Sequence, residues 1–222
     1  MERLARYLKT IDRRWLLIWS LIYAGFLLLS IFAPDALGVL LLRYFGIVLA
    51  FVYACQKFPK DHLLKLALGF TLAADTLLAI DNVSVIGVAV FCFAQFFHFC
   101  RLHRTNPYLV PGFFAVVAAA FTSSLIFGLD PMFAVAGVYG LTLLSNVFLA
   151  IHWHHKSPSV HSACAMYGFI LFLLCDACVG ASYLSNTAIL PSALYPFANY
   201  FAWAFYYPSQ ILLSNSSKLK KL

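Results

Sequence analysis

The chain has 222 residues, of which 63% are hydrophobic and only 10% are charged. With a mean hydropathy of +0.87, this composition excludes a soluble globular domain of the same length. Unbroken apolar runs of about twenty residues match the length of helix that crosses a bilayer. A transmembrane β-barrel would instead alternate polar and apolar residues over segments of about ten. The composition therefore predicts an all-α, polytopic membrane protein.

The apolar runs predict a bundle of eight transmembrane helices in a single domain, residues 1–222. The expected spans are residues 15–33, 37–55, 63–80, 83–100, 108–127, 132–151, 162–184 and 192–213. The first run is longer than the apolar part of a signal peptide and no small-residue cleavage site follows it, so we expect it to be retained. Short basic tails, residues 1–14 and 214–222, flank the bundle.

The net charge is +7, and 13 of the 15 Lys and Arg residues occupy both tails and every second connection between the spans. They are Arg3, Arg6, Lys9, Arg13, Arg14, Lys57, Lys60, Arg101, Arg104, Lys156, Lys218, Lys220 and Lys221. The other connections hold no Lys or Arg, and three of them contain Asp35, Asp81 and Asp130. The positive-inside rule then places both termini in the cytoplasm. We expect no nucleic-acid partner, and we expect the bacterial cytoplasmic membrane as the location.

Two carboxylates, Asp75 and Asp176, lie inside the third and seventh predicted spans. An Asp at the centre of a spanning helix costs about 2.5–3.5 kcal/mol on insertion scales, so it marks a functional site by default. Both spans run in the same direction, and the depths of the two acids differ by about 5 Å at 1.5 Å per residue. We therefore expect the two carboxylates to face one another if the two spans are neighbours.

Further polar side chains could line a cavity around these acids. In the last span Asn199, Trp203, Tyr206 and Gln210 follow at i, i+4, i+7 and i+11, which places them on one helix face beside Tyr207. That face is expected to point into the bundle, and Pro208 is expected to loosen the helix. The other candidates are Thr71, Gln95, His98, Tyr139, Asn146 and the intramembrane Arg43. Hydrogen bonding between helices is the alternative role for each polar group.

Neither a metal nor a disulfide framework is predicted. His152, His154, His155 and His161 cluster after the sixth span, but no acid or cysteine joins them at metal-ligand spacing. The six cysteines lie in or at the edges of apolar spans. Cys175 and Cys178 have a redox spacing, but they lie within a span and are expected to be buried thiols.

Four segments in order resemble the YhhN-like, lysoplasmalogenase family. Residues 68–78, around Asp75-Thr76-Leu77-Leu78, resemble its first acidic motif, and residues 87–95 are similar to the span that follows it. Residues 171–177 resemble the second acidic motif, and residues 206–210 resemble the closing Tyr-Tyr-x-x-Gln. The chain departs from the family pattern at Ala74 in place of Gly, at Gln95 in place of His, and at Cys175 and Ala177 in place of two serines.

The resemblance implies a metal-independent ether hydrolase without a cofactor. Its substrate would be a lysophospholipid of the lysoplasmalogen type, drawn from the membrane lipids, and its products a fatty aldehyde and a glycerophospho-base. It implies Asp75 and Asp176 as catalytic residues. Tyr206, Tyr207, Gln210, Gln95, His98, Asn146, Tyr139 and Arg43 are the candidates for substrate binding.

The reaction agrees with the residues, because a vinyl ether is hydrolysed by protonation of carbon followed by capture of an oxocarbenium ion by water. Glycosidases use paired carboxylates around a similar cation. Two other functions stay open at this stage: a proton-coupled transporter, which also uses intramembrane Asp, and a non-catalytic lipid-binding protein. The sequence carries no prediction of oligomeric state.

Overall fold

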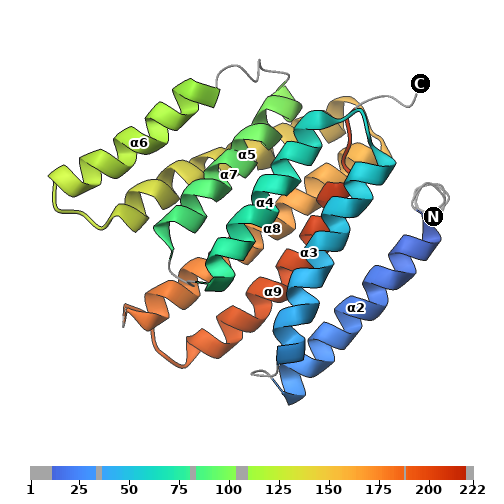
Figure 1. Ribbon diagram of the computed structural model, residues 1–222, viewed down its shortest axis with the longest axis horizontal. Coiled ribbons are helices and arrows are strands. Elements are labelled where there is room, and N and C mark those ends of the chain that lie inside the picture. The colour runs from blue at the N-terminus through green and yellow to red at the C-terminus, as the bar shows by residue number, and fades with distance from the viewer. Residues whose placement is uncertain (1–11, 34–36, 81–83, 104–109, 188, 219–222) are drawn as a thin grey trace. The chain divides into compact units, whose positions relative to one another are not determined.

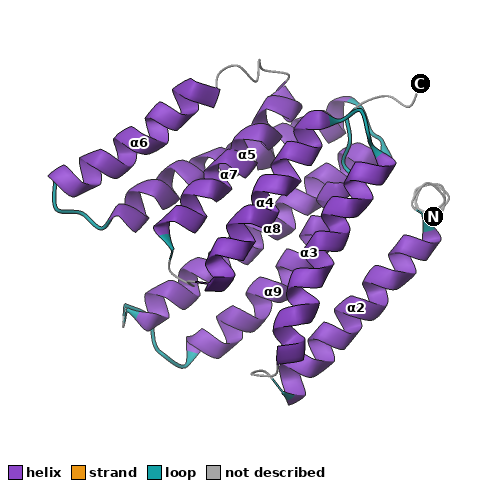
Figure 2. Cartoon of the chain, in the orientation of Figure 1, coloured by secondary structure: helices purple, strands orange, loops and turns teal. Residues whose placement is uncertain are grey.

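The computed structural model describes residues 12–33, 37–80, 84–103, 110–187 and 189–218, and it contains eight α-helices and no strand in that part of the chain (Figures 1 and 2). The helices are α2 (Arg13–Phe32), α3 (Leu37–Lys57), α4 (His62–Ile80), α5 (Val85–His103), α6 (Val110–Ile126), α7 (Pro131–Lys156), α8 (Val160–Asn186) and α9 (Leu194–Ser214). The all-α prediction is confirmed.

The prediction of eight membrane spans is wrong. Six of the described helices, α2, α3, α4, α5, α7 and α8, are long and apolar enough to cross a bilayer. Helix α6 is apolar but has only 17 residues. Helix α9 has 21 residues and no charged side chain, so its polar groups are what lower its hydropathy below that of a spanning helix. The chain is nevertheless a multi-pass helical membrane protein.

Helix starts follow local capping rules. The carboxylate of Asp130 accepts a hydrogen bond from the backbone N–H of Met132 at 2.8 Å, and Pro131 occupies the first turn of α7. At the start of α8 the side chains of Ser159 and Ser162 each accept a hydrogen bond from the other's backbone N–H. These caps satisfy N–H groups that the first helical turn leaves without a partner.

The chain divides into two compact units. The first unit contains α2, α3 up to Ala50, α8 and α9. Within it, α8 and α9 are packed side by side over most of their lengths. Gly168 permits this approach, because a Cβ at that position would lie 3.0 Å from the Leu213 side chain.

The second unit contains the end of α3 from Phe51, then α4, α5, α6 and α7, together with the segment that begins at Ser217. Helix α5 lies against both α4 and α7, and α6 packs on α7. Cys92, Val117 and Val135, one each from α5, α6 and α7, form a buried apolar cluster.

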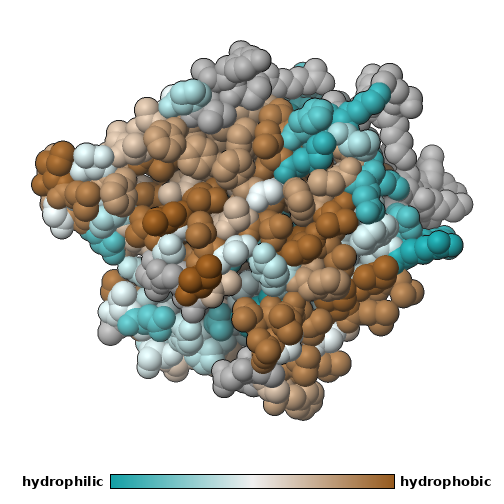
Figure 3. All heavy atoms as spheres, viewed as in Figure 1, coloured by the Kyte–Doolittle hydropathy of each residue, from teal (hydrophilic) through white to brown (hydrophobic). Residues whose placement is uncertain are grey.

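Large apolar side chains are exposed along most helices, and hydrophobic residues cover much of the face drawn in Figure 3. Phe148 and Leu141 of α7 are each 70% exposed, and Ile80 of α4 is 81% exposed. Lipid tails are as apolar as leucine, so such side chains suit a bilayer, whereas in water they would form an aggregation-prone surface.

Several residues of the predicted charge pattern lie outside the described residues. They are Arg3, Arg6, Lys9, Asp35, Asp81, Arg104, Lys220 and Lys221.

Candidate functional site

The structure places the predicted site residues in two groups, one in each compact unit. Asp176, Arg43, Tyr206, Tyr207 and Gln210 belong to the first unit. The second unit contains Asp75, Gln95, His98, Tyr139 and Asn146. That the two acids face one another stays a prediction.

In the first unit, Asp176 is half-buried in α8. Phe172, one turn earlier in α8, makes an edge-on contact with Tyr206 of α9, with ring centroids 5.4 Å apart. Residues four apart share a helix face, so Asp176 belongs to the same side of α8 as Phe172.

Arg43 lies in an aromatic cage in the first unit. Its guanidinium carbon is 4.6 Å from the centroid of the Trp203 ring and 5.4 Å from that of Phe26. Cation–π contacts of this kind contribute about 0.5–2 kcal/mol each, which offsets part of the cost of a cation within the membrane. The Nε atom is buried and has no hydrogen-bond partner among the described residues. A guanidinium held in this way suits a phosphate group.

Tyr207 is 3% exposed, and its ring lies directly over Gly46 of α3. It also stacks on Tyr23 of α2, with centroids 5.3 Å apart and an interplanar angle of 19°. The Tyr207 hydroxyl is buried and makes no hydrogen bond within the described part of the chain. The phenol is thus held rigidly with an unused donor and acceptor.

Gln210 lies one turn further along α9 and is 1% exposed. Its amide nitrogen is 3.4 Å from the Ser209 hydroxyl, and its amide oxygen has no partner in the described residues. Tyr206 and Gln210 are both buried, so the predicted inward orientation of this stripe is confirmed for these two residues.

The predicted effect of Pro208 takes a specific form. Helix α9 continues through Pro208, but proline has no N–H to donate to the carbonyl of Ala204 four residues earlier. The Tyr23 hydroxyl donates to that carbonyl at 2.8 Å. Tyr23, Phe26 and Gly46 were not anticipated from the sequence. The Pro208 position indicates an orphan carbonyl at Ala204, but no local pattern indicates which distant side chain fills it.

In the second unit, Asp75 lies one turn after Thr71 in α4. Thr71 is fully buried and donates to the Ala67 carbonyl at 3.0 Å, so its hydroxyl is used within its own helix. Asp75 is half-buried.

Gln95 and Asn146 form the polar centre of the second unit. Both are fully buried, and the Asn146 amide nitrogen donates to the Gln95 backbone carbonyl and to its side-chain oxygen, each at 2.9 Å. The Gln95 amide nitrogen and the Asn146 amide oxygen have no partner among the described residues. One unused donor therefore lies close to one unused acceptor, an arrangement that suits a water molecule or a hydroxyl group.

His98 lies one turn beyond Gln95 and is fully buried. Its Nδ1 atom is 3.1 Å from a terminal nitrogen of Arg101. A guanidinium can only donate, so Nδ1 accepts and the imidazole hydrogen is on Nε2. His98 is thus a neutral histidine in this contact. Tyr139 packs beside the apolar cluster of Cys92, Val117 and Val135, with its ring 5.9 Å from that of Phe91.

The described residues contain no group of three or more His, Cys, Asp or Glu side chains placed to hold a metal ion. Of the histidines that cluster in the sequence, His161 directs Nδ1 to the Asn215 carbonyl at 2.6 Å. The six cysteines all lie in described residues, and none of them forms a disulfide.

A polytopic helical membrane protein with acids in its apolar helices is the class that these observations define. Residues 38–217 match the YhhN family. Because the match covers most of the chain, this protein belongs to the YhhN family. No protein with a curated description and no solved structure matches the chain.

Proposed function

We propose that this protein is a membrane-embedded hydrolase that cleaves the vinyl ether bond of lysoplasmalogen-type lysophospholipids and releases a fatty aldehyde. The observation that carries the proposal is the family match over residues 38–217, since the YhhN family includes lysoplasmalogenases. Both acidic motifs of the chain fall within that match.

The proposed reaction needs a proton donor and a negative charge. One carboxylic acid, from Asp75 or Asp176, gives its proton to the vinyl ether carbon that is not bonded to oxygen. The C=C electron pair forms the new C–H bond, and positive charge develops on the adjacent carbon and the ether oxygen. The second carboxylate stabilises this oxocarbenium ion, as in glycosidases.

Water then adds to the oxocarbenium carbon and loses a proton to a carboxylate. The resulting hemiacetal collapses, the C–O bond to glycerol breaks, and the aldehyde and the glycerophospho-base leave. One water is consumed and the acid regains its proton, so the cycle needs no oxidant, metal or cofactor.

The binding residues have distinct proposed roles. Arg43, held between Phe26 and Trp203, is suited to the substrate phosphate. The unused hydroxyl of Tyr207 and amide oxygen of Gln210 are suited to the glycerol hydroxyl or to the attacking water. The Gln95 and Asn146 amides offer a second position for water. His98 and Tyr139 remain proposed contacts of the substrate.

The orientation in the membrane is also a proposal. The basic residues of the tails and alternate connections favour a cytoplasmic location for both termini, in a bacterial cytoplasmic membrane.

The test is aldehyde release from a lysoplasmalogen by the purified protein in lipid vesicles. Asp75→Asn and Asp176→Asn keep the side-chain shape but remove the acid, so each variant is expected to lower kcat by at least about 100-fold, the usual worth of general acid catalysis. The matched control is Asp130→Asn at the start of α7, which changes an acid outside the proposed site. Undiminished turnover in either site variant would remove that acid from the mechanism. Substrate flux across the vesicle without aldehyde would indicate a transporter.

A further inference from the structure

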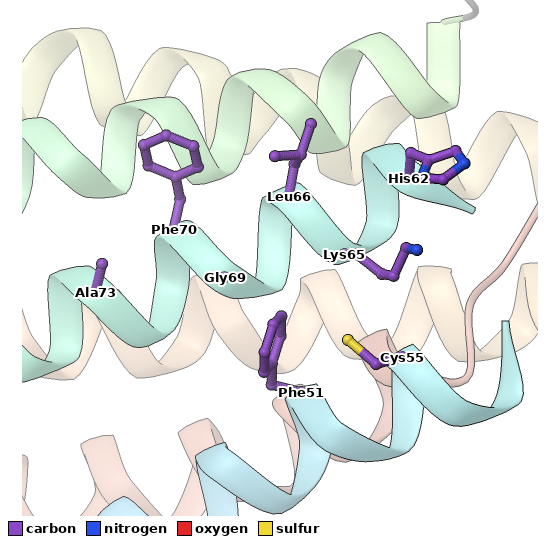
Figure 4. A pocket seen from close by; sticks show the side chains of 8 residues that line it. All are labelled: Phe51, Cys55, His62, Lys65, Leu66, Gly69, Phe70 and Ala73. Atoms are coloured by element: carbon purple, nitrogen blue, oxygen red, sulfur yellow. The ribbon is translucent and has the colours of Figure 1, made fainter. Parts of the chain in front are cut away.

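A groove in the second unit lies apart from all residues assigned above. It has a volume of about 570 Å³ and opens between the end of α3 and the first half of α4 (Figure 4). Its apolar lining consists of Phe51 and Cys55 from α3 and Leu66, Gly69, Phe70 and Ala73 from α4. A Cβ at Gly69 would lie in van der Waals contact with the Phe51 ring, at 3.5 Å, so a large side chain at this position would enter the groove.

One end of the groove is cationic. The Lys65 side chain extends from α4 toward Cys55, and His62 stands at the same end, whereas Phe70 and Ala73 mark the other end (Figure 4). The Lys65 ammonium donates to the Pro59 carbonyl at 2.7 Å, and it has two further N–H groups.

The charge around this end is one-sided. Lys57 closes α3, and Lys60 is exposed in the connection to α4. The one acid of this connection, Asp61, is 5% exposed and turned away. Its two oxygens accept hydrogen bonds from the Leu64 backbone N–H at 3.1 Å and the Ser217 hydroxyl at 2.8 Å. Asp61 is therefore already engaged, and the three lysines attract an anion.

The groove is complementary to a membrane amphiphile, because it is cationic at one end and apolar along its length. Its cationic end lies where α3 ends and α4 begins, which is where two spanning helices reach the membrane surface. Its apolar length follows α4 toward the middle of the bilayer. A lipid placed along it would have its phosphate at Lys65 and an acyl chain over Leu66, Phe70 and Ala73.

The geometry does not suit a substrate poised for cleavage. Ten residues separate Lys65 from Asp75, a rise of about 15 Å along α4. In a lysoplasmalogen only the three-carbon glycerol unit separates the phosphate from the vinyl ether. With its phosphate at Lys65, the reactive bond would stay well short of Asp75. The occupant is thus a different lipid.

We propose that this groove binds a diacyl phospholipid with a net negative headgroup, such as phosphatidylglycerol, from the leaflet that the α3–α4 connection faces. Three lysines give the preference for negative charge, and the apolar wall holds one acyl chain. The site is distinct from the proposed catalytic residues and does not depend on the proposed activity.

The experiment is native mass spectrometry of the delipidated protein titrated separately with phosphatidylglycerol, phosphatidylcholine and a lysophospholipid. Each cation near a headgroup contributes about 1 kcal/mol, so phosphatidylglycerol is expected to bind at least about fivefold more tightly than phosphatidylcholine. Lys65→Gln should lower that ratio by about fivefold. Gly69→Leu, which fills the groove, should weaken the binding of both diacyl lipids.

Two matched controls isolate the groove. Lys156→Gln removes an exposed lysine from the last turn of α7, and Gly137→Leu adds the same bulk where a Cβ meets nothing within 4 Å. Both should bind lipid as the unaltered protein does. If Gly69→Leu elutes as an aggregate, Ala73→Leu fills the other end of the groove at an exposed position.

Equal affinity for the two diacyl lipids, tighter binding of the lysophospholipid, or unchanged binding by a folded groove-filling variant would overturn the proposal. Aldehyde release, measured on the same samples, separates this result from the proposed function. The groove variants alter no proposed catalytic or substrate-binding residue, so loss of the lipid with retained turnover supports a separate site.

Discussion

At the scale of single residues, the hydrogen bond between Tyr23 and Ala204 shows how α9 tolerates a proline in its interior. Pro208 removes a backbone donor, and a hydroxyl from α2 replaces it at 2.8 Å. The same tyrosine stacks on Tyr207. Tyr23 therefore both donates the hydrogen bond that Pro208 cannot make and helps to position the Tyr207 phenol, which is a proposed substrate-binding group.

Tyr23→Phe is therefore expected to destabilise the protein by about 1–3 kcal/mol, because the Ala204 carbonyl loses its donor away from water. Thermal unfolding in detergent, followed by size-exclusion chromatography, measures the effect. In a Pro208→Ala background the restored N–H can donate to the same carbonyl, so the loss from Tyr23→Phe should be markedly smaller. An equal loss in both backgrounds would contradict this explanation.

At the scale of helices, α3 and α9 approach closely where the Tyr207 ring covers Gly46. A methyl group at Gly46 would overlap that ring, so an alanine there must displace Tyr207 from between α3 and Tyr23. The glycine is needed for the space it leaves and not for an unusual backbone conformation.

Gly46→Ala should lower stability by about 1–3 kcal/mol, as overpacking does. It should also reduce aldehyde release through the displaced Tyr207. Gly180→Ala in α8 is the matched control, since a Cβ there meets nothing within 4 Å and alanine favours the helix. The comparison uses melting temperatures and turnover of the two variants. If Gly46→Ala and Gly180→Ala have the same melting temperature and turnover, the close approach of α3 and α9 at Gly46 does not contribute to stability or activity.

The positions of the helices could be predicted from the sequence, but the number of helices that span the membrane could not. Apolar runs locate all eight helices of the described chain, because twenty apolar residues cannot fold as a soluble loop. Counting each run as a crossing failed at α6 and α9 for two different reasons. Helix α6 is short. Helix α9 has polar residues where a spanning helix is apolar, namely Asn199, Tyr206, Ser209 and Gln210, and the last three of these are buried.

At the scale of the whole molecule, the polar stripe of α9 could be anticipated because helical spacing alone decides which side chains share a face. The pairing of Gln95 with Asn146 could not, because their 51-residue separation in sequence gives no local signal of contact. The aromatic cage around Arg43 likewise joins α2, α3 and α9. Long-range contacts of this kind depend on which helices are neighbours.

The two acids occupy separate compact units, and the proposed reaction requires both. Asp176 lies on the side of α8 that carries Phe172, whose ring contacts Tyr206 of α9, and Asp75 lies one turn after the buried Thr71 of α4. In the proposed reaction a carboxylic acid of this chain protonates carbon, and the hydrogen that is added is retained in the aldehyde at the moment of its release.

The most direct test is hydrolysis of a lysoplasmalogen in D₂O, with mass spectrometry of the released aldehyde trapped as it forms. A carboxylic acid exchanges its proton with solvent, so protonation of the vinyl ether carbon predicts one deuterium on the carbon next to the aldehyde group. Asp75→Asn and Asp176→Asn should form little of this product. An aldehyde without deuterium at that carbon, or no aldehyde from the unaltered protein, would contradict the account.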